Sequence, residues 1–88
     1  MPKPRVSVAR ARKAVRDVLK MQEGEPLAEA PMLDACNELV GGGMDLTDLR
    51  DALEWNHSEA LIRSEYVAEA DLDGWVITKA GINHDRIK

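Results

Sequence analysis

The chain of 88 residues has few aromatic residues: it contains no Phe, one Tyr and two Trp. A hydrophobic core must therefore come mainly from Leu, Val, Ala, Met and Ile, a composition that favours helices. The single cysteine, Cys36, excludes an internal disulfide. No apolar run approaches the roughly 18 residues that cross a membrane, and the N-terminus lacks the apolar stretch of a signal peptide. We therefore expect a cytoplasmic protein.

Charge is distributed unevenly along the chain. Its length predicts one small domain. The net charge is −4, with 44% apolar and 32% charged residues, as expected for a folded chain. Residues 1–20 carry seven basic residues and one acidic residue, whereas residues 21–73 carry two basic and fourteen acidic residues. Basic residues again predominate in 74–88. This block pattern predicts an interaction surface without naming the partner.

The first helix is predicted from about Arg5 to Glu23, because apolar residues recur there at helical spacing. The stripe is formed by Val8, Ala11, Val15, Val18, Leu19 and Gln22. Lys and Arg residues gather beside this stripe, which makes the helix amphipathic and basic. We divide the chain accordingly into a basic N-terminal arm (1–24), a domain (25–82) and a tail (83–88).

Three shorter helices are predicted in the domain. The first has Pro31 in its first turn, with a start near Pro26 as the alternative, and it runs to Val40, where Gly41–Gly43 ends it. The second runs from Thr47 to Trp55. Asn56–Ser58 is predicted as a turn, and Ser58 would cap a last helix from Glu59 to Ser64 or Glu65.

A β-hairpin is predicted near the C-terminus, because Asp73-Gly74 lies between alternating apolar residues. The strands would run from about Tyr66 to Leu72 and from Trp75 to Lys79. Tyr66, Ala68, Ala70, Leu72, Trp75 and Ile77 would then share one face and pack on the helices. The expected fold class is mainly α with a C-terminal β-hairpin.

The helices followed by Tyr66-Val67 and by Trp75-Val-Ile-Thr-Lys-Ala-Gly81 resemble the winged helix-turn-helix family over about residues 31–82. The resemblance implies four helices with a two-stranded wing, and it places the recognition helix at 56–65. It also implies a DNA-binding protein, either a transcriptional regulator or a phage- or plasmid-type regulator, that acts as a dimer. Residues Asn56, His57, Ser58 and Arg63 would meet groove edges.

The basic helix is the strongest functional signal, because phosphate neutralisation supplies most nonspecific affinity for nucleic acid. The candidate DNA-binding residues are Arg5, Arg10, Arg12, Lys13, Arg16, Lys20, Asn56, His57, Ser58, Arg63 and Lys79. Two alternatives stay open for the basic face: it packs on the acidic middle of this chain or of a second copy, or it is simply solvated. The alternative function is an acidic protein–protein adaptor or inhibitor that does not bind DNA directly.

No enzymatic motif is present in the sequence. Gly41–Gly43 is followed by Met-Asp, which excludes a P-loop, and His57 and His84 have no companions at metal-ligand spacing. We therefore expect no catalytic residues, no metal and no cofactor. Trp55, Trp75 and Cys36 are expected in the core rather than at a site.

Overall fold

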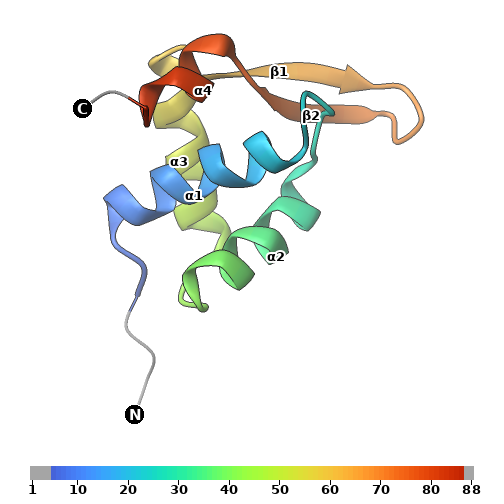
Figure 1. Cartoon of the computed structure of the whole chain (residues 1–88). Helices are drawn as coiled ribbons and strands as arrows, with labels where there is room; N and C mark the ends of the chain where they lie inside the picture. Colours follow the sequence, from blue (N-terminus) through green and yellow to red (C-terminus); the bar gives the residue numbers. More distant parts are fainter. Residues whose placement is uncertain (1–4, 87–88) are drawn as a thin grey trace.

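The structure, a computed structural model, describes residues 5–86 (Figure 1). Within that range the elements are α1 (Val8–Met21), α2 (Glu29–Val40), α3 (Leu46–Ser58), β1 (Ile62–Val67), β2 (Leu72–Ile77) and α4 (Lys79–His84). Four helices with one two-stranded antiparallel sheet agree with the predicted fold class. Residues 1–4 of the predicted arm and 87–88 of the predicted tail lie outside the described residues.

Local capping sets the ends of the first three helices. Ser7 caps α1 by accepting a hydrogen bond from the Arg10 amide, and Asp45 and Asp48 form a reciprocal capping box at the start of α3. Gly41 ends α2 in the left-handed region, with φ 83°. The predicted ends of the first two helices are confirmed to within a few residues.

The core lies around α1, which contacts α2, α3, α4 and β2 (Figure 1). Val15 and Leu19 of α1, Met32 of α2, Leu49 of α3 and Ile62 of β1 are essentially inaccessible to solvent. Full burial of such side chains stabilises the fold by about 1.5–3 kcal/mol each. The small domain therefore depends on α1, which packs against most of the other elements.

The predicted turn at 56–58 and the predicted helix at 59–65 are wrong. Helix α3 continues through Asn56 and His57 to Ser58, and the chain then enters β1 at Ile62. Asn56 is completely buried and donates hydrogen bonds to the carbonyls of Ala52 and Arg12. Asparagine alone favours turns, because its side chain competes for backbone hydrogen bonds. Here the side-chain amide is hydrogen-bonded in the core, and this tertiary environment outweighs the local preference.

The predicted hairpin exists, but its turn lies four residues earlier than expected. Residues 68–71 form the turn, and Asp73 and Gly74 lie inside β2, opposite Tyr66 and Glu65. A Cβ on Gly74 would lie 3.1 Å from the Pro26 Cβ atom. Glycine at 74 thus allows the segment before α2 to approach the strand closely, rather than making a turn.

The shifted turn changes the faces of the hairpin. Tyr66, Trp75 and Ile77 share a face as predicted, but Leu72 lies on the opposite face, paired with Val67. Leu27 forms an isolated antiparallel bridge with Trp75, whose amide and carbonyl both bond to Leu27. The sheet is therefore held on the β2 side by the loop that follows α1.

Helix α4 (Lys79–His84) was not predicted, and its first residue, Lys79, was predicted as the end of a strand. Thr78 caps it by accepting a hydrogen bond from the Gly81 amide. Gly81 is buried, and a Cβ there would lie 2.1 Å from the carbonyl oxygen of Leu61. The glycine in the Thr-Lys-Ala-Gly sequence thus permits close packing of α4 on the β1 entry. None of the helices in residues 5–86 has the length and apolar character of a membrane span.

The close approach at Gly81 generates a stability prediction. Gly81→Ala should lower the free energy of unfolding by about 2–3 kcal/mol, because backbone must shift to admit the methyl group. Chemical denaturation followed by circular dichroism measures the change. Ala80→Ser, at an exposed position of the same helix, should change stability by less than about 0.5 kcal/mol. Equal effects of the two substitutions would contradict the packing role of Gly81.

Candidate functional site

The predicted phosphate-binding residues of α1 are mostly engaged within the protein. Arg16 is only 6% exposed, and its Nε and Nη2 atoms each lie 3.0 Å from a carboxylate oxygen of Asp85. Its Nη1 atom donates to the Asn56 side chain at 3.1 Å. Lys20 Nζ lies 3.2 Å from the same Asp85 carboxylate. These four residues form a cluster, here called the Arg16 clamp, that joins α1, α3 and the end of α4.

The Arg16 clamp holds Asp85 ionised. Hydrogen bonding from Arg16, with a further contribution from Lys20, lowers the pKa of the Asp85 carboxyl far below its ordinary value, although burial opposes the shift. The carboxylate keeps a full negative charge against a buried guanidinium. Arg16 and Asn56 are therefore structural residues, and neither is available to a nucleic acid.

The other cations in α1 and Arg5, which precedes it, differ in how strongly they interact with their own chain. Arg5 donates to Asp48 at 2.6 Å, and Lys13 donates to Asp17 at 2.7 Å. The pKa of Arg5 and that of Lys13 are both raised by these hydrogen bonds. The Arg12 guanidinium lies 4.4 Å from the centre of the Trp55 ring, a cation–π contact. Arg10 makes only a 3.4 Å contact with the carbonyl of Val40.

The remaining predicted residues do not form a recognition helix. His57 is exposed at the end of α3 and contacts the Trp75 ring edge-on, and Ser58 bonds back to the Trp55 carbonyl. Arg63 lies on β1 and pairs with Glu65 at 2.9 Å. Lys79 is exposed at the start of α4 and has no ion pair among residues 5–86. The structure therefore separates these side chains over three elements.

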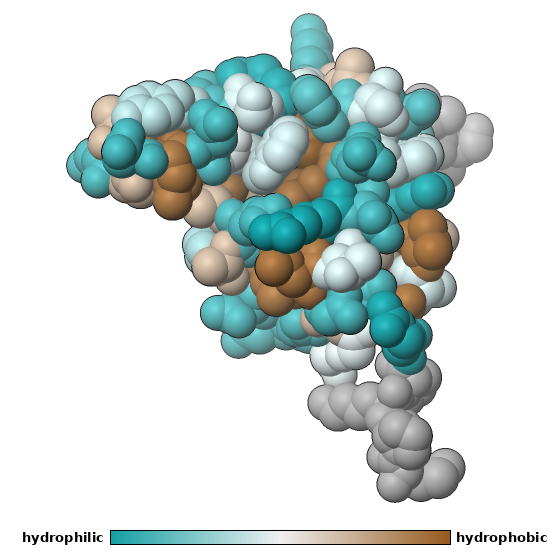
Figure 2. Space-filling view, turned by 180° about the vertical axis from the view of Figure 1, so that it is seen from behind, coloured by the Kyte–Doolittle hydropathy of each residue, from teal (hydrophilic) through white to brown (hydrophobic). Residues whose placement is uncertain are grey.

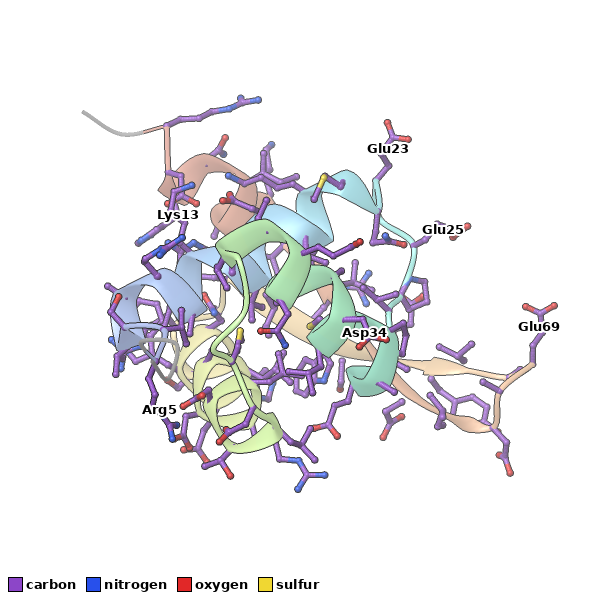
Figure 3. The ribbon with its side chains drawn as sticks, turned by 90° about the horizontal axis from the view of Figure 1, so that it is seen from below. Arg5, Lys13, Glu23, Glu25, Asp34 and Glu69 are labelled. Carbon is purple, nitrogen blue, oxygen red and sulfur yellow. The ribbon has the colours of Figure 1, made fainter. Side chains whose placement is uncertain are left out.

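Carboxylates, by contrast, are largely unpaired. Within residues 5–86, those without an ion pair are Glu23, Glu25, Asp34, Glu38, Asp51, Glu54, Glu59, Glu69, Asp71 and Asp73. Figure 3 shows Arg5 and Lys13 on one side of the molecule and Glu23, Glu25 and Glu69 on the opposite side. Arg5 and Lys13 thus lie near the start of α1, whereas Glu23 and Glu25 lie beyond its end and Glu69 lies on the hairpin.

One region combines apolar side chains with carboxylates that lie near them in the chain, and the sequence did not reveal it as a surface. At Gly74, an added Cβ would lie 3.1 Å from Pro26 and 3.2 Å from Val67, so both border this position. Leu72 pairs with Val67 and is 42% exposed. We call Pro26, Val67 and Leu72, with the flanking Glu23, Glu25 and Glu69, the loop–wing surface. Figure 2 shows the opposite face of the molecule, on which the projecting hairpin is mainly hydrophilic with a small hydrophobic area.

The loop–wing surface escaped sequence reasoning because the strand register was misplaced. With the turn at Asp73-Gly74, Leu72 was expected on the core side. The signal that could have found it is the Val67–Leu72 pair on either side of the segment Ala68–Asp71, which contains two acidic residues and is a four-residue turn in the structure. An exposed apolar pair with charged neighbours is typical of an interaction surface.

Residues 5–86 contain no cluster of metal ligands and no activated nucleophilic cysteine. No group of three or more His, Cys, Asp or Glu residues within 5–86 is arranged to hold a metal ion. Cys36 is completely buried, and burial raises the pKa of its thiol to about 11. The thiol therefore stays protonated at neutral pH and is a poor nucleophile.

Comparison with known proteins adds no assignment. A scan against protein-family models and searches of curated proteins and of solved structures found no match for this chain.

The Arg16 clamp generates a prediction with a pH dependence. Asp85→Asn should lower the free energy of unfolding at pH 7 by about 2–3 kcal/mol, because buried Arg16 loses its charged partner. The folded-state pKa of Asp85 lies below 3.8. The stabilisation from Asp85 is therefore fully present above the ordinary pKa of 3.8, which applies to the unfolded chain. It is lost progressively as the pH falls from there to the lower pKa of the folded state.

Urea unfolding at pH 7 and pH 3 measures this effect. The stability difference between wild type and Asp85→Asn should be smaller at pH 3. Asp73→Asn is the matched control, since Asp73 is exposed and has no ion pair in the described chain. If both variants lost the same small amount at pH 7, the clamp would not be a stabilising element.

Proposed function

We propose that this protein is a winged-helix-like module that binds a basic surface of a partner protein through the loop–wing surface. The supporting observation is the contrast in charge pairing. Most α1 cations contact carboxylates or an aromatic ring of their own chain, whereas Glu23, Glu25 and Glu69 have no cationic partner in residues 5–86. Unpaired carboxylates around apolar side chains steer and orient a basic partner.

The order of elements supports a winged-helix layout. Helix α1 is followed by the Leu27 bridge, two helices and a hairpin, with Leu27 pairing to the second hairpin strand. Helix α3, which directly precedes the hairpin, takes the position of a recognition helix in this layout. Its exposed residues include Asp51 and Glu54, and its only arginine, Arg50, pairs with Glu29 at 3.1 Å. Phosphates would be repelled by such a helix.

Direct DNA binding is the second candidate, and Arg10 favours it. This side chain is exposed, has no carboxylate partner within residues 5–86, and lies on the same helix as Lys13. For α1 to contact several phosphates, Arg5 and Lys13 would have to leave Asp48 and Asp17. Exchange of exposed ion pairs costs little, but Arg16 remains buried in its clamp and contributes nothing.

Two defined probes test the proposal: a short peptide of alternating Lys and Leu, and a short DNA duplex, both at ~50 mM salt. The peptide should shift backbone amide resonances of the loop–wing surface in an NMR titration. Glu25→Lys/Glu69→Lys should weaken peptide binding at least about fivefold, because two exposed attractive charges become repulsive.

Glu38→Lys/Glu54→Lys is the matched control. It changes net charge by the same amount at exposed, unpaired carboxylates of α2 and α3, and it should weaken peptide binding less. Equal weakening by both double variants would show that only overall charge matters. Shifts at Arg10 and Lys13 with DNA, a steep salt dependence and no peptide effect at the hairpin would favour the DNA-binding function instead.

A further inference from the structure

Strand β1 has one open edge. The sheet consists of β1 and β2 alone, and Leu27 bridges β2 on the side away from β1. Besides the bonds to β2, the only backbone hydrogen bond that Ile62–Val67 makes within residues 5–86 is one in the turn, where the Val67 carbonyl accepts from the Ala70 amide at 3.2 Å. An unprotected edge of this length is a template for pairing with another strand, and it carries neither proline nor a bulge.

The register fixes which backbone groups point outwards. The Trp75 amide donates to the Leu27 carbonyl at 2.9 Å, and the Trp75 carbonyl accepts from the Leu27 amide at 3.0 Å. Trp75 and Ser64 therefore form a non-hydrogen-bonded pair across the hairpin. The amide and carbonyl of Ser64 therefore point away from β2, to the open edge. Because this direction alternates along a strand, the same holds for Tyr66, which is exposed, and for Ile62, which is only 1% exposed and therefore covered at the edge.

The side chains around Ser64 are self-complementary in charge. Arg63 and Glu65 flank it, and both reach the surface, with side-chain exposures of 55% and 41%. If a second copy of β1 runs antiparallel about a two-fold axis at Ser64, Arg63 of each copy lies opposite Glu65 of the other. We propose that the open edge of β1 binds a second copy of this chain in that register.

The geometry of this pairing is favourable in two ways. Ser64 is exposed and would exchange both backbone hydrogen bonds with Ser64 of the second copy. The Arg63–Glu65 contacts then fall in non-hydrogen-bonded pairs, where Cα atoms are only about 4.5 Å apart and side chains interact most strongly. The internal 2.9 Å Arg63–Glu65 pair is solvent-exposed, so sharing it between copies costs little.

Sedimentation equilibrium of the intact chain over a wide concentration range tests the inference. Wild type should show a reversible monomer–dimer equilibrium. Arg63→Glu should weaken dimerisation by about tenfold, because two attractive pairs become repulsive. The exchange Arg63→Glu/Glu65→Arg should restore it, since the opposite charges again face each other.

Two further variants separate the edge from general effects. Ser64→Pro removes an amide that points away from β2, so it should abolish dimerisation while circular dichroism shows an intact fold. Arg50→Glu reverses an exposed charge on α3 and should leave the equilibrium unchanged. A chain that stays monomeric at the highest concentration overturns the inference, as does dimerisation unaffected by Arg63→Glu or Ser64→Pro. These measurements use no partner or DNA and are independent of the proposed function.

Discussion

The interaction between Arg16 and Asp85 is the constraint on which the rest of the structure depends. It places a buried guanidinium on α1 between the Asn56 amide of α3 and a carboxylate at the end of α4. A buried charge is tolerated only with partners of this quality, because an unpaired one costs several kcal/mol. Helix α1, around which the core packs, is thereby fixed against the two elements that precede and follow the hairpin.

This constraint also determines how the charges of the protein are used. Several basic residues of α1 form ion pairs or a cation–π contact within the chain. Many carboxylates of the acidic middle segment, by contrast, are exposed and have no cationic partner in residues 5–86. A strongly basic sequence segment thus becomes a weakly basic surface. The charged groups without ion pairs in residues 5–86 are therefore mainly carboxylates. For this reason we place the partner-binding site at the loop–wing surface rather than on α1.

The sequence predicted the parts of the fold that depend on local physics. Helical spacing located α1, and Pro31 and Gly41 marked the ends of α2 to within a few residues. It failed where distant contacts override local preference: Asn56 is a buried polar core residue, and Gly74 makes room for Pro26. The cations predicted to bind DNA were identified, but their partners within the chain were not, because Asp85 is 69 residues away from Arg16.

Cys36 has a practical consequence. It is the only cysteine in the chain, it is completely buried, and its thiol remains protonated in neutral buffer. A cysteine introduced at the hairpin tip or at the start of α1 would therefore react with a maleimide probe far faster than the native thiol. Fluorophores or spin labels can thus be attached at one chosen position without first removing a core residue.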